Sequence, residues 1–125
     1  MKKITEAKDA PAAIGPYSQA VRHGNLLFIS GQIPMNPATK EIATDIEEAT
    51  NQVLDNIGAI LKHNDCKFEN VLKTTIFLKN LENFSIVNDI YEKRFPKNPP
   101  ARSTIEVSRL PKDVEIEIEA IAICE

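Results

Sequence analysis

The segment that leads to the C-terminus constrains the fold of this chain most strongly. From Val114 to Cys124 the residues alternate between two faces, with the period of two that is typical of a β-strand. One face is apolar from end to end: Val114, Ile116, Ile118, Ala120, Ala122 and Cys124. The other face begins with Glu115, Glu117 and Glu119 and ends with Ile121 and Ile123. We expect helices to cover the first face and a second copy of the chain to cover the isoleucines, because they would otherwise leave an apolar patch in water.

Helical periodicity identifies the elements that would cover this sheet. Thr44 precedes Glu47 by three residues, which is the spacing of a capping box at the start of a helix. The apolar stripe of this helix consists of Ile46, Ala49, Val53, Ile57, Ile60 and Leu61. A second helix is predicted from about Asn80 to Arg94, before a proline-rich stretch. Its buried residues are expected to be Phe84, Val87 and Tyr91.

The remaining periodic segments are short and strand-like. Residues 19–22 and 26–33 form a predicted hairpin around His23-Gly24-Asn25. Residues 71–78 and 103–107 supply two further strands, so the order of elements is ββαβαββ after a short N-terminal strand. Two helices with one apolar face each, together with five or six strands, predict an α+β fold with both helices on one face of the sheet.

Composition and charge narrow the classes of function. The 125 residues fit a single domain spanning 1–125. The net charge of -3, with Lys and Arg scattered along the sequence, argues against a nucleic-acid partner. No apolar run approaches the ~20 residues of a membrane helix. The N-terminal segment turns acidic too early for a signal peptide, so we expect a cytoplasmic protein without a membrane partner.

Cysteine and histidine positions give no sign of a metal or disulfide site. Cys66 and Cys124 are too few for a disulfide framework and lack the spacing of metal ligands. His23 and His63 stand far apart and outside any zinc pattern. We therefore expect neither a metal nor another cofactor.

Charged residues in the strands are the first candidates for chemistry. If the glutamate-bearing face of the last strand borders an interface, burial would raise the pKa of one glutamate and make it a proton shuttle. A solvated strand face is the alternative. Arg102 follows a proline-rich loop and enters a strand, so its guanidinium could bind a carboxylate through two parallel hydrogen bonds. A surface arginine in a weak ion pair is the alternative here.

Three further positions are candidates for a ligand pocket. Ser30-Gly31 offers a hydroxyl and a backbone that a ligand can approach closely, although a bulge or a strand end would explain the pair equally well. Tyr17 follows the turn-forming Gly15-Pro16, which would present its ring at an interface or leave it half-buried. Asn88 lies at the edge of the second helix's apolar stripe and points either into a cleft or to solvent.

Four segments, taken together, resemble the RidA (YjgF-type) family over almost the full length of the chain. They run from Ala10 to Gln19, from Ser30 to Pro34, from Pro100 to Ser103 and from Arg109 to Ala120. The resemblance implies a chorismate-mutase-like fold with a mixed sheet. It also implies a homotrimer in which three sheets pack into a central barrel, with the active sites in clefts between subunits.

The same resemblance implies an activity, the hydrolysis of 2-iminopropanoate and 2-iminobutanoate to 2-keto acids and ammonia. These imines arise from enamines that pyridoxal-phosphate-dependent dehydratases release. By the matching motifs, Arg102 would hold the substrate carboxylate and Glu117 would activate water. The pocket would be lined by Tyr17, Ser30, Gly31, Asn88 and the backbone near Thr104. Some relatives carry a cysteine where this chain has Thr104, and the loop before Arg102 is shorter than in some members.

Two other functions compete with this interpretation. A non-catalytic ligand-binding, regulatory or chaperone-like module would use the same cleft without turnover. A translation inhibitor or endoribonuclease gains little support, because the sequence has no basic run, no aromatic stacking platform and no histidine pair for RNA cleavage.

Overall fold

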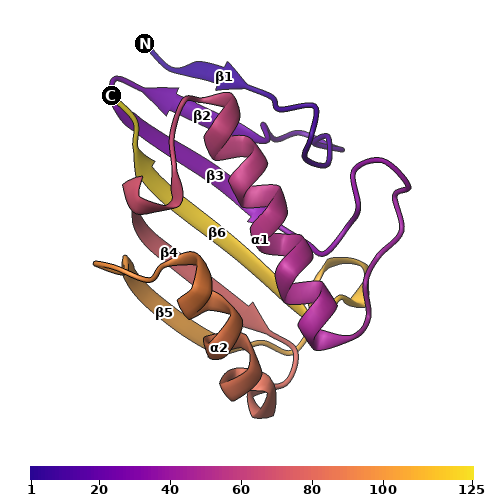
Figure 1. Ribbon diagram of the computed structural model, residues 1–125. Coiled ribbons are helices and arrows are strands. Elements are labelled where there is room, and N and C mark those ends of the chain that lie inside the picture. Colours follow the sequence, from indigo (N-terminus) through magenta and orange to yellow (C-terminus); the bar gives the residue numbers. More distant parts are fainter.

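Six strands form one sheet in the order β1-β2-β3-β6-β4-β5, and both long helices lie on the same face of it (Figure 1). The computed structural model describes all residues from Met1 to Glu125. The strands are β1 Lys3–Thr5, β2 Ala20–His23, β3 Leu26–Gln32, β4 Val71–Leu78, β5 Ala101–Glu106 and β6 Ile116–Ile123. The helices are α1 Ile46–His63 and α2 Phe84–Arg94, with 3-10 turns η1 Phe68–Asn70, η2 Leu81–Asn83 and η3 Pro111–Asp113. The predicted α+β fold with two helices on one face is confirmed.

The last strand of the chain lies in the middle of the sheet. β6 pairs antiparallel with β3 on one side and with β4 on the other. β4 and β5 are the parallel pair, which α2 connects, so the sheet is mixed as expected. The alternation read from the sequence is present in β6, whose even-numbered residues are buried beneath the helices while its odd-numbered residues lie on the other face.

Helix α1 begins one residue later than the capping box predicts. Asp45 is the N-cap, and its carboxylate accepts a hydrogen bond from the backbone N–H of Glu48 at 3.1 Å. The expected cap at Thr44 is therefore wrong, because the same three-residue spacing to a glutamate occurs in two adjacent registers. Asp45 also places negative charge at the positive end of the helix dipole. The predicted apolar stripe packs on the sheet, with Ile46 alone left partly exposed.

Helix α2 is shorter than predicted. The side chain of Asn80 caps the 3-10 turn η2 by accepting from the N–H of Glu82, and the α-helix starts only at Phe84. Val87 and Tyr91 are buried as expected. Ile90 is also buried, whereas Phe84 at the helix start stays partly exposed.

The face of the sheet away from the helices is uncovered in the single chain. Phe28 of β3 and Ile105 of β5 expose 43% and 44% of their surface. Val21 pairs with Phe28, and Phe28 pairs with Ile121, so an apolar row crosses β2, β3 and β6. This open face is the apolar surface that the sequence predicts, and its cover by a second copy stays a prediction.

The two cysteines are paired, which corrects the expectation from the sequence. Cys66 follows α1, Cys124 follows β6, and the two form a disulfide with their Cα atoms 5.4 Å apart. Their separation of 58 residues gave no sign of this proximity, which arises only because the ends of α1 and β6 meet in the fold. Neither helix is long and apolar enough to cross a membrane.

Candidate active site

A β-bulge brings Glu117 against the backbone of Gly31. The pairing of β3 with β6 shifts between Ile29 and Gln32, so that two residues of β3 lie opposite the single Glu119. The Glu117 side chain lies so close to Gly31 that a Cβ atom there would overlap its carboxylate. A larger residue at position 31 would therefore displace the Glu117 carboxylate from its observed position. The bulge alternative for Ser30-Gly31 is correct, and the bulge itself shapes the site.

The Glu117 carboxylate is half-buried and has no cationic side chain within ion-pair distance. Burial raises the pKa of Glu117 above its ordinary value of 4.5, and the negative charge of Glu119 on the same strand face raises it further. A carboxyl group with a raised pKa exchanges protons closer to neutral pH. The position therefore suits a group that takes a proton from water and returns it.

Tyr17 and Ser30 share a cleft of about 650 Å³ with Gly31 and Glu117. Tyr17 is 54% exposed on a bend that begins at Gly15, whose φ of +119° lies in a region that favours glycine. The Ser30 hydroxyl donates a hydrogen bond to the backbone oxygen of Ser18 at 2.6 Å. Its remaining lone pairs are free to accept from a ligand. Four of the seven predicted site residues therefore lie together.

Gln19 also lines this cleft, and sequence reasoning did not single it out. Its side chain is buried and bonds to three backbone groups of the N-terminal segment, namely Ala7 N–H, Ala7 C=O and Pro11 C=O. These bonds fix the start of the loop that carries Tyr17. The only sign of this role in the sequence is that Gln19 stands at the start of a predicted strand, which is weak evidence by itself.

A second cluster surrounds Arg102 on β5. One guanidinium nitrogen donates a hydrogen bond to the Asn88 side-chain oxygen at 2.8 Å. The guanidinium carbon lies 5.4 Å from the centroid of the Phe84 ring and 5.0 Å from that of Tyr91. No acidic side chain pairs with Arg102, so the ion-pair alternative is wrong. The guanidinium is held in place with its other N–H groups available to an anion.

The two aromatic rings beside Arg102 were not predicted as part of the site, although helical spacing places both on the side of α2 that carries Asn88. Phe84 and Tyr91 lie four residues before and three residues after Asn88, on the same side of α2. The Tyr91 hydroxyl hydrogen-bonds the Thr74 hydroxyl at 2.6 Å, and burial raises the pKa of Tyr91. Asn88 and Arg102 line one cleft of about 630 Å³ with Tyr91.

Thr104 lies two residues beyond Arg102 on β5. Its hydroxyl is buried and has no hydrogen-bond partner in the chain. It lines neither cleft, so the structure does not bring it to a pocket within one chain.

Arg102 and Glu117 lie on opposite faces of the sheet. Arg102 pairs with Thr74, whose side chain is buried beneath the helices. Glu117 pairs with Phe77, and since the face alternates along β4, its side chain points away from the helices. The two clefts share no residue. One chain therefore presents two separate clefts, one at Glu117 and one at Arg102.

Comparisons with known proteins found similar sequences over almost the full length of the chain. The model of the family described as endoribonuclease L-PSP matches residues 7–124. The protein named 2-iminobutanoate/2-iminopropanoate deaminase of Escherichia coli K12 is 49% identical over 126 residues, covering 98% of both chains.

Two solved structures share the fold. One is YyfA of Yersinia pestis, described as a protein of unknown function of the conserved Rid family. It has a TM-score of 0.94 and 51% identity, over 98% of this chain and 99% of that one. The other is E. coli TdcF with bound serine, with a TM-score of 0.94 and 41% identity, over 98% of this chain and 99% of that one.

Proposed function

The chain belongs to the RidA family, and from this membership we propose that it hydrolyses 2-imino acids to 2-keto acids and ammonia. The substrates are 2-iminopropanoate and 2-iminobutanoate, which form from enamines released by pyridoxal-phosphate-dependent dehydratases. The observation that supports this best is Glu117, a half-buried carboxylate of raised pKa that faces an open cleft. The name of the E. coli relative agrees with it.

Glu117 acts first as a base and then as an acid. The imine enters in its protonated form, the iminium. The Glu117 carboxylate takes a proton from water while the water oxygen bonds to the iminium carbon, which gives a neutral tetrahedral carbinolamine. The protonated Glu117 then donates to the nitrogen, the C–N bond breaks and ammonia leaves as the keto group forms. The hydroxyl proton of the carbinolamine passes to solvent as the keto group forms, which balances the proton that the iminium brought. Glu117 ends ionised as it began, so the reaction needs only water and this carboxyl group.

Arg102 binds the substrate carboxylate. A planar guanidinium forms two parallel hydrogen bonds to a carboxylate, and charged hydrogen bonds of this kind contribute roughly 1.5–3 kcal/mol each. Asn88 already holds one nitrogen, and the aromatic rings of α2 hold the guanidinium plane. The side chain therefore loses little freedom when the substrate binds.

We propose that the complete site forms between two copies of the chain in a homotrimer. The carboxylate of a 2-imino acid is bonded directly to the carbon that water attacks, so the groups that bind these two parts must lie side by side. Arg102 and Glu117 of one chain point to opposite faces of the sheet. The exposed Phe28 and Ile105 supply apolar surface for association. Tyr17, Ser30 and Gly31 then enter the site with Glu117.

Asn88 enters this shared site with Arg102, and the backbone near Thr104 completes the contacts. The reaction as written uses no metal or other cofactor. We propose that the protein acts in the cytoplasm, where it would hydrolyse imines before they react with other molecules. The cleft that holds Glu117 contains no histidine, which favours imine hydrolysis over the RNA cleavage that the family description names.

The test couples a threonine dehydratase to semicarbazide, which traps the imine as a semicarbazone. Addition of the protein should reduce semicarbazone formation, because hydrolysis competes with the trap. Arg102→Ala should abolish this reduction while the assembly stays intact. Unchanged trapping with the assembled wild-type protein would reject the deaminase function.

A ligand-binding role without turnover is the second candidate. The serine bound to TdcF favours it, since serine carries a carboxylate next to a carbon that bears nitrogen. Glu117→Gln separates the two functions. An enzyme loses turnover but keeps 2-keto acid binding through Arg102, whereas a binding module has no turnover to lose.

A further inference from the structure

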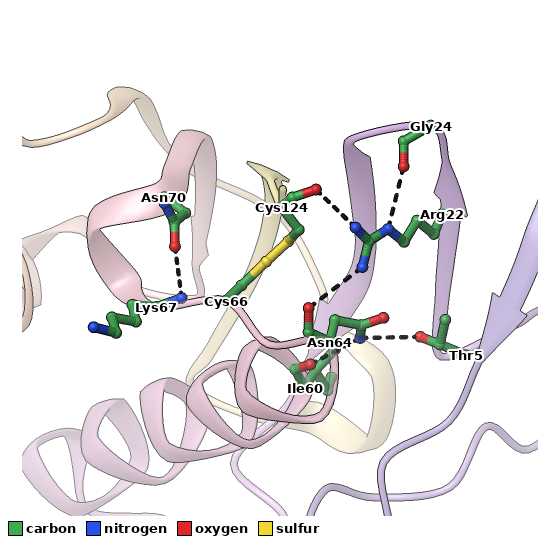
Figure 2. Close-up of a disulfide and its surroundings, with 9 residues drawn as sticks. All are labelled: Thr5, Arg22, Gly24, Ile60, Asn64, Cys66, Lys67, Asn70 and Cys124. Atoms are coloured by element: carbon green, nitrogen blue, oxygen red, sulfur yellow. Dashed lines mark hydrogen bonds between the residues drawn. A yellow bond between two sulfur atoms is a disulfide. The ribbon is translucent and has the colours of Figure 1, made fainter.

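Away from the Glu117 cleft and the Arg102 cleft, two cysteines are held together where α1 and β6 end (Figure 2). We propose that Cys66 and Cys124 are a reversible dithiol–disulfide pair that locks the end of the central strand β6 to the end of α1. Neither cysteine lines the Glu117 cleft or the Arg102 cleft. The inference therefore stands independently of the proposed function.

The backbone around Cys66 is fixed by a helix-ending motif. The Cys66 N–H donates to the carbonyl of Leu61 at 2.8 Å, and the Asp65 N–H donates to that of Lys62 at 3.0 Å. Asp65 between them has a φ of +57°. These are the two bonds and the left-handed residue of a Schellman motif, which places its following residue against the last turn of the helix. The motif directs Cys66 into the core whether or not a disulfide is present.

The backbone around Cys124 is fixed from the other side. Its N–H donates to the carbonyl of Asn25 at 2.6 Å. Its carbonyl accepts from Arg22 at 2.7 Å. Asn25 belongs to the turn between β2 and β3, and Arg22 belongs to β2, so one backbone group and one side chain hold the end of β6 to the neighbouring hairpin.

Arg22 joins the two cysteine-bearing segments. One guanidinium nitrogen donates to the carbonyl of Cys124, and another donates to that of Asn64 at 3.3 Å, two residues before Cys66 (Figure 2). With the Cα atoms 5.4 Å apart, the pair lies within the range of natural disulfides. The hydrogen bonds that position the two cysteines do not depend on the sulfur–sulfur bond. The reduced chain therefore holds the two thiols close enough to form the disulfide.

Exchange with a low-molecular-weight disulfide closes the pair. One cysteine thiolate attacks the small disulfide, forms a mixed disulfide and releases one thiol. The second thiolate attacks the protein sulfur of the mixed disulfide, forms the Cys66–Cys124 bond and releases the second thiol. The residues are only 5% and 1% exposed, so exchange requires a brief local opening. Both lie just outside regular elements, where such opening costs least.

Closure of the pair should change stability and leave turnover unaffected. The bond closes a loop with a sequence separation of 58, which restricts the unfolded chain. Glu117 lies seven positions earlier on β6, roughly 23 Å away along the strand. Its surroundings are therefore the same in both redox states.

The experiment compares the folded wild-type protein after incubation with dithiothreitol and with oxidised glutathione. Iodoacetamide is added after unfolding in denaturant, and the intact mass counts the free thiols. We expect two alkylated cysteines after reduction and none after oxidation, with full recovery when dithiothreitol is added back. The melting temperature of the oxidised form should be higher by roughly 10 °C.

Cys66→Ala and Cys124→Ala are the matched controls, and each should melt at the same temperature under both conditions. Two alkylated cysteines after oxidation, or a glutathione adduct in place of the internal bond, would overturn the proposal. Equal melting temperatures of the fully oxidised and fully reduced wild-type protein would show that the disulfide does not stabilise the fold, which would contradict the proposed lock between α1 and β6. These outcomes need only the wild-type protein, so they stand even if a variant folds poorly.

Discussion

Glu117 is the residue on which the proposed chemistry depends most, because its carboxylate would carry the proton in both steps. Glu117→Gln removes this function while it keeps the shape of the side chain. We expect turnover to fall by about 10²- to 10⁴-fold, the usual contribution of general acid–base catalysis. The semicarbazide competition assay measures the loss. Glu115→Gln, two residues before Glu117 and just outside β6, is the matched control and should retain near wild-type turnover.

The raised pKa of Glu117 also predicts how that variant changes stability. Burial disfavours the charged form, so the folded state holds its proton more tightly than the unfolded state does. The wild-type protein therefore loses stability as the pH rises from the ordinary glutamate range through the raised pKa. Glu117→Gln should melt at a slightly higher temperature at pH 7 and at the same temperature at pH 3. A lower melting temperature at pH 7 would contradict the assigned burial effect.

Glu119 gives a separate prediction about the pH profile. Its charge is the second cause of the raised pKa of Glu117, after burial. Since Glu117 must be ionised to accept a proton from water, turnover should decline as the pH falls through that pKa. Glu119→Gln should shift this decline to lower pH, as a pH–rate profile would record. If the pH–rate profile of Glu119→Gln matched that of the wild-type protein, the charge of Glu119 would not be a cause of the raised pKa of Glu117.

Arg102→Lys tests the carboxylate-binding role. A lysine keeps the charge but cannot form two parallel hydrogen bonds, so turnover at low substrate should fall roughly 10- to 100-fold. Arg94→Lys is the matched control, because Arg94 lies on α2 and pairs with Asp55 outside the site. Near-normal turnover of Arg102→Lys would reject the bidentate role.

Residue types and local spacing predicted several of the side chains that line the clefts, but not how they are held. Family resemblance was needed to single out Glu117 among the three glutamates, Gln19 was missed, and Thr104 lines neither cleft. Arg102 was singled out because a stiff loop leads into its strand. The two aromatic rings beside it come from α2, and only the pairing of β5 with β4 brings them near. The approach of Glu117 to Gly31 likewise depends on a bulge whose register is set by two strands far apart in the sequence.

Among the elements, periodicity predicted the strands and helices well because each has one buried face. The strand over residues 71–78 has the predicted bounds, and the alternation in β6 matches the burial. Element ends were less predictable. Thr44 and Asp45 are both suitable N-caps followed by a glutamate three residues later, so the local sequence does not decide between them.

Asp45→Ala tests the cap that the structure selects. Loss of the bond to the Glu48 N–H should lower the free energy of unfolding by about 1 kcal/mol. Thr44→Ala is the control and should change it by less than about 0.5 kcal/mol. Chemical denaturation of both variants checks the prediction, and a larger loss from Thr44→Ala than from Asp45→Ala would contradict the cap seen in the structure.

At the scale of the whole molecule, the structure explains why one chain is insufficient for the proposed reaction. The sheet separates Arg102 from Glu117, and its open face leaves Phe28 and Ile105 in solvent. An apolar strand face predicted that a partner would be needed, while the number of copies came only from family resemblance. The cysteine pair was not predicted, since no local pattern shows that the ends of α1 and β6 meet.

The most direct test of the shared site mixes two inactive variants, Arg102→Ala and Glu117→Gln, and lets the subunits exchange. In a trimer with sites between neighbours, every mixed trimer contains one site that takes Glu117 from the first variant and Arg102 from the second. An equal random mixture should therefore recover about a quarter of wild-type turnover. Light scattering and native mass spectrometry would first verify that mixed trimers form. Recovery near one quarter is the predicted result, and mixed trimers without activity would contradict a site built from two chains.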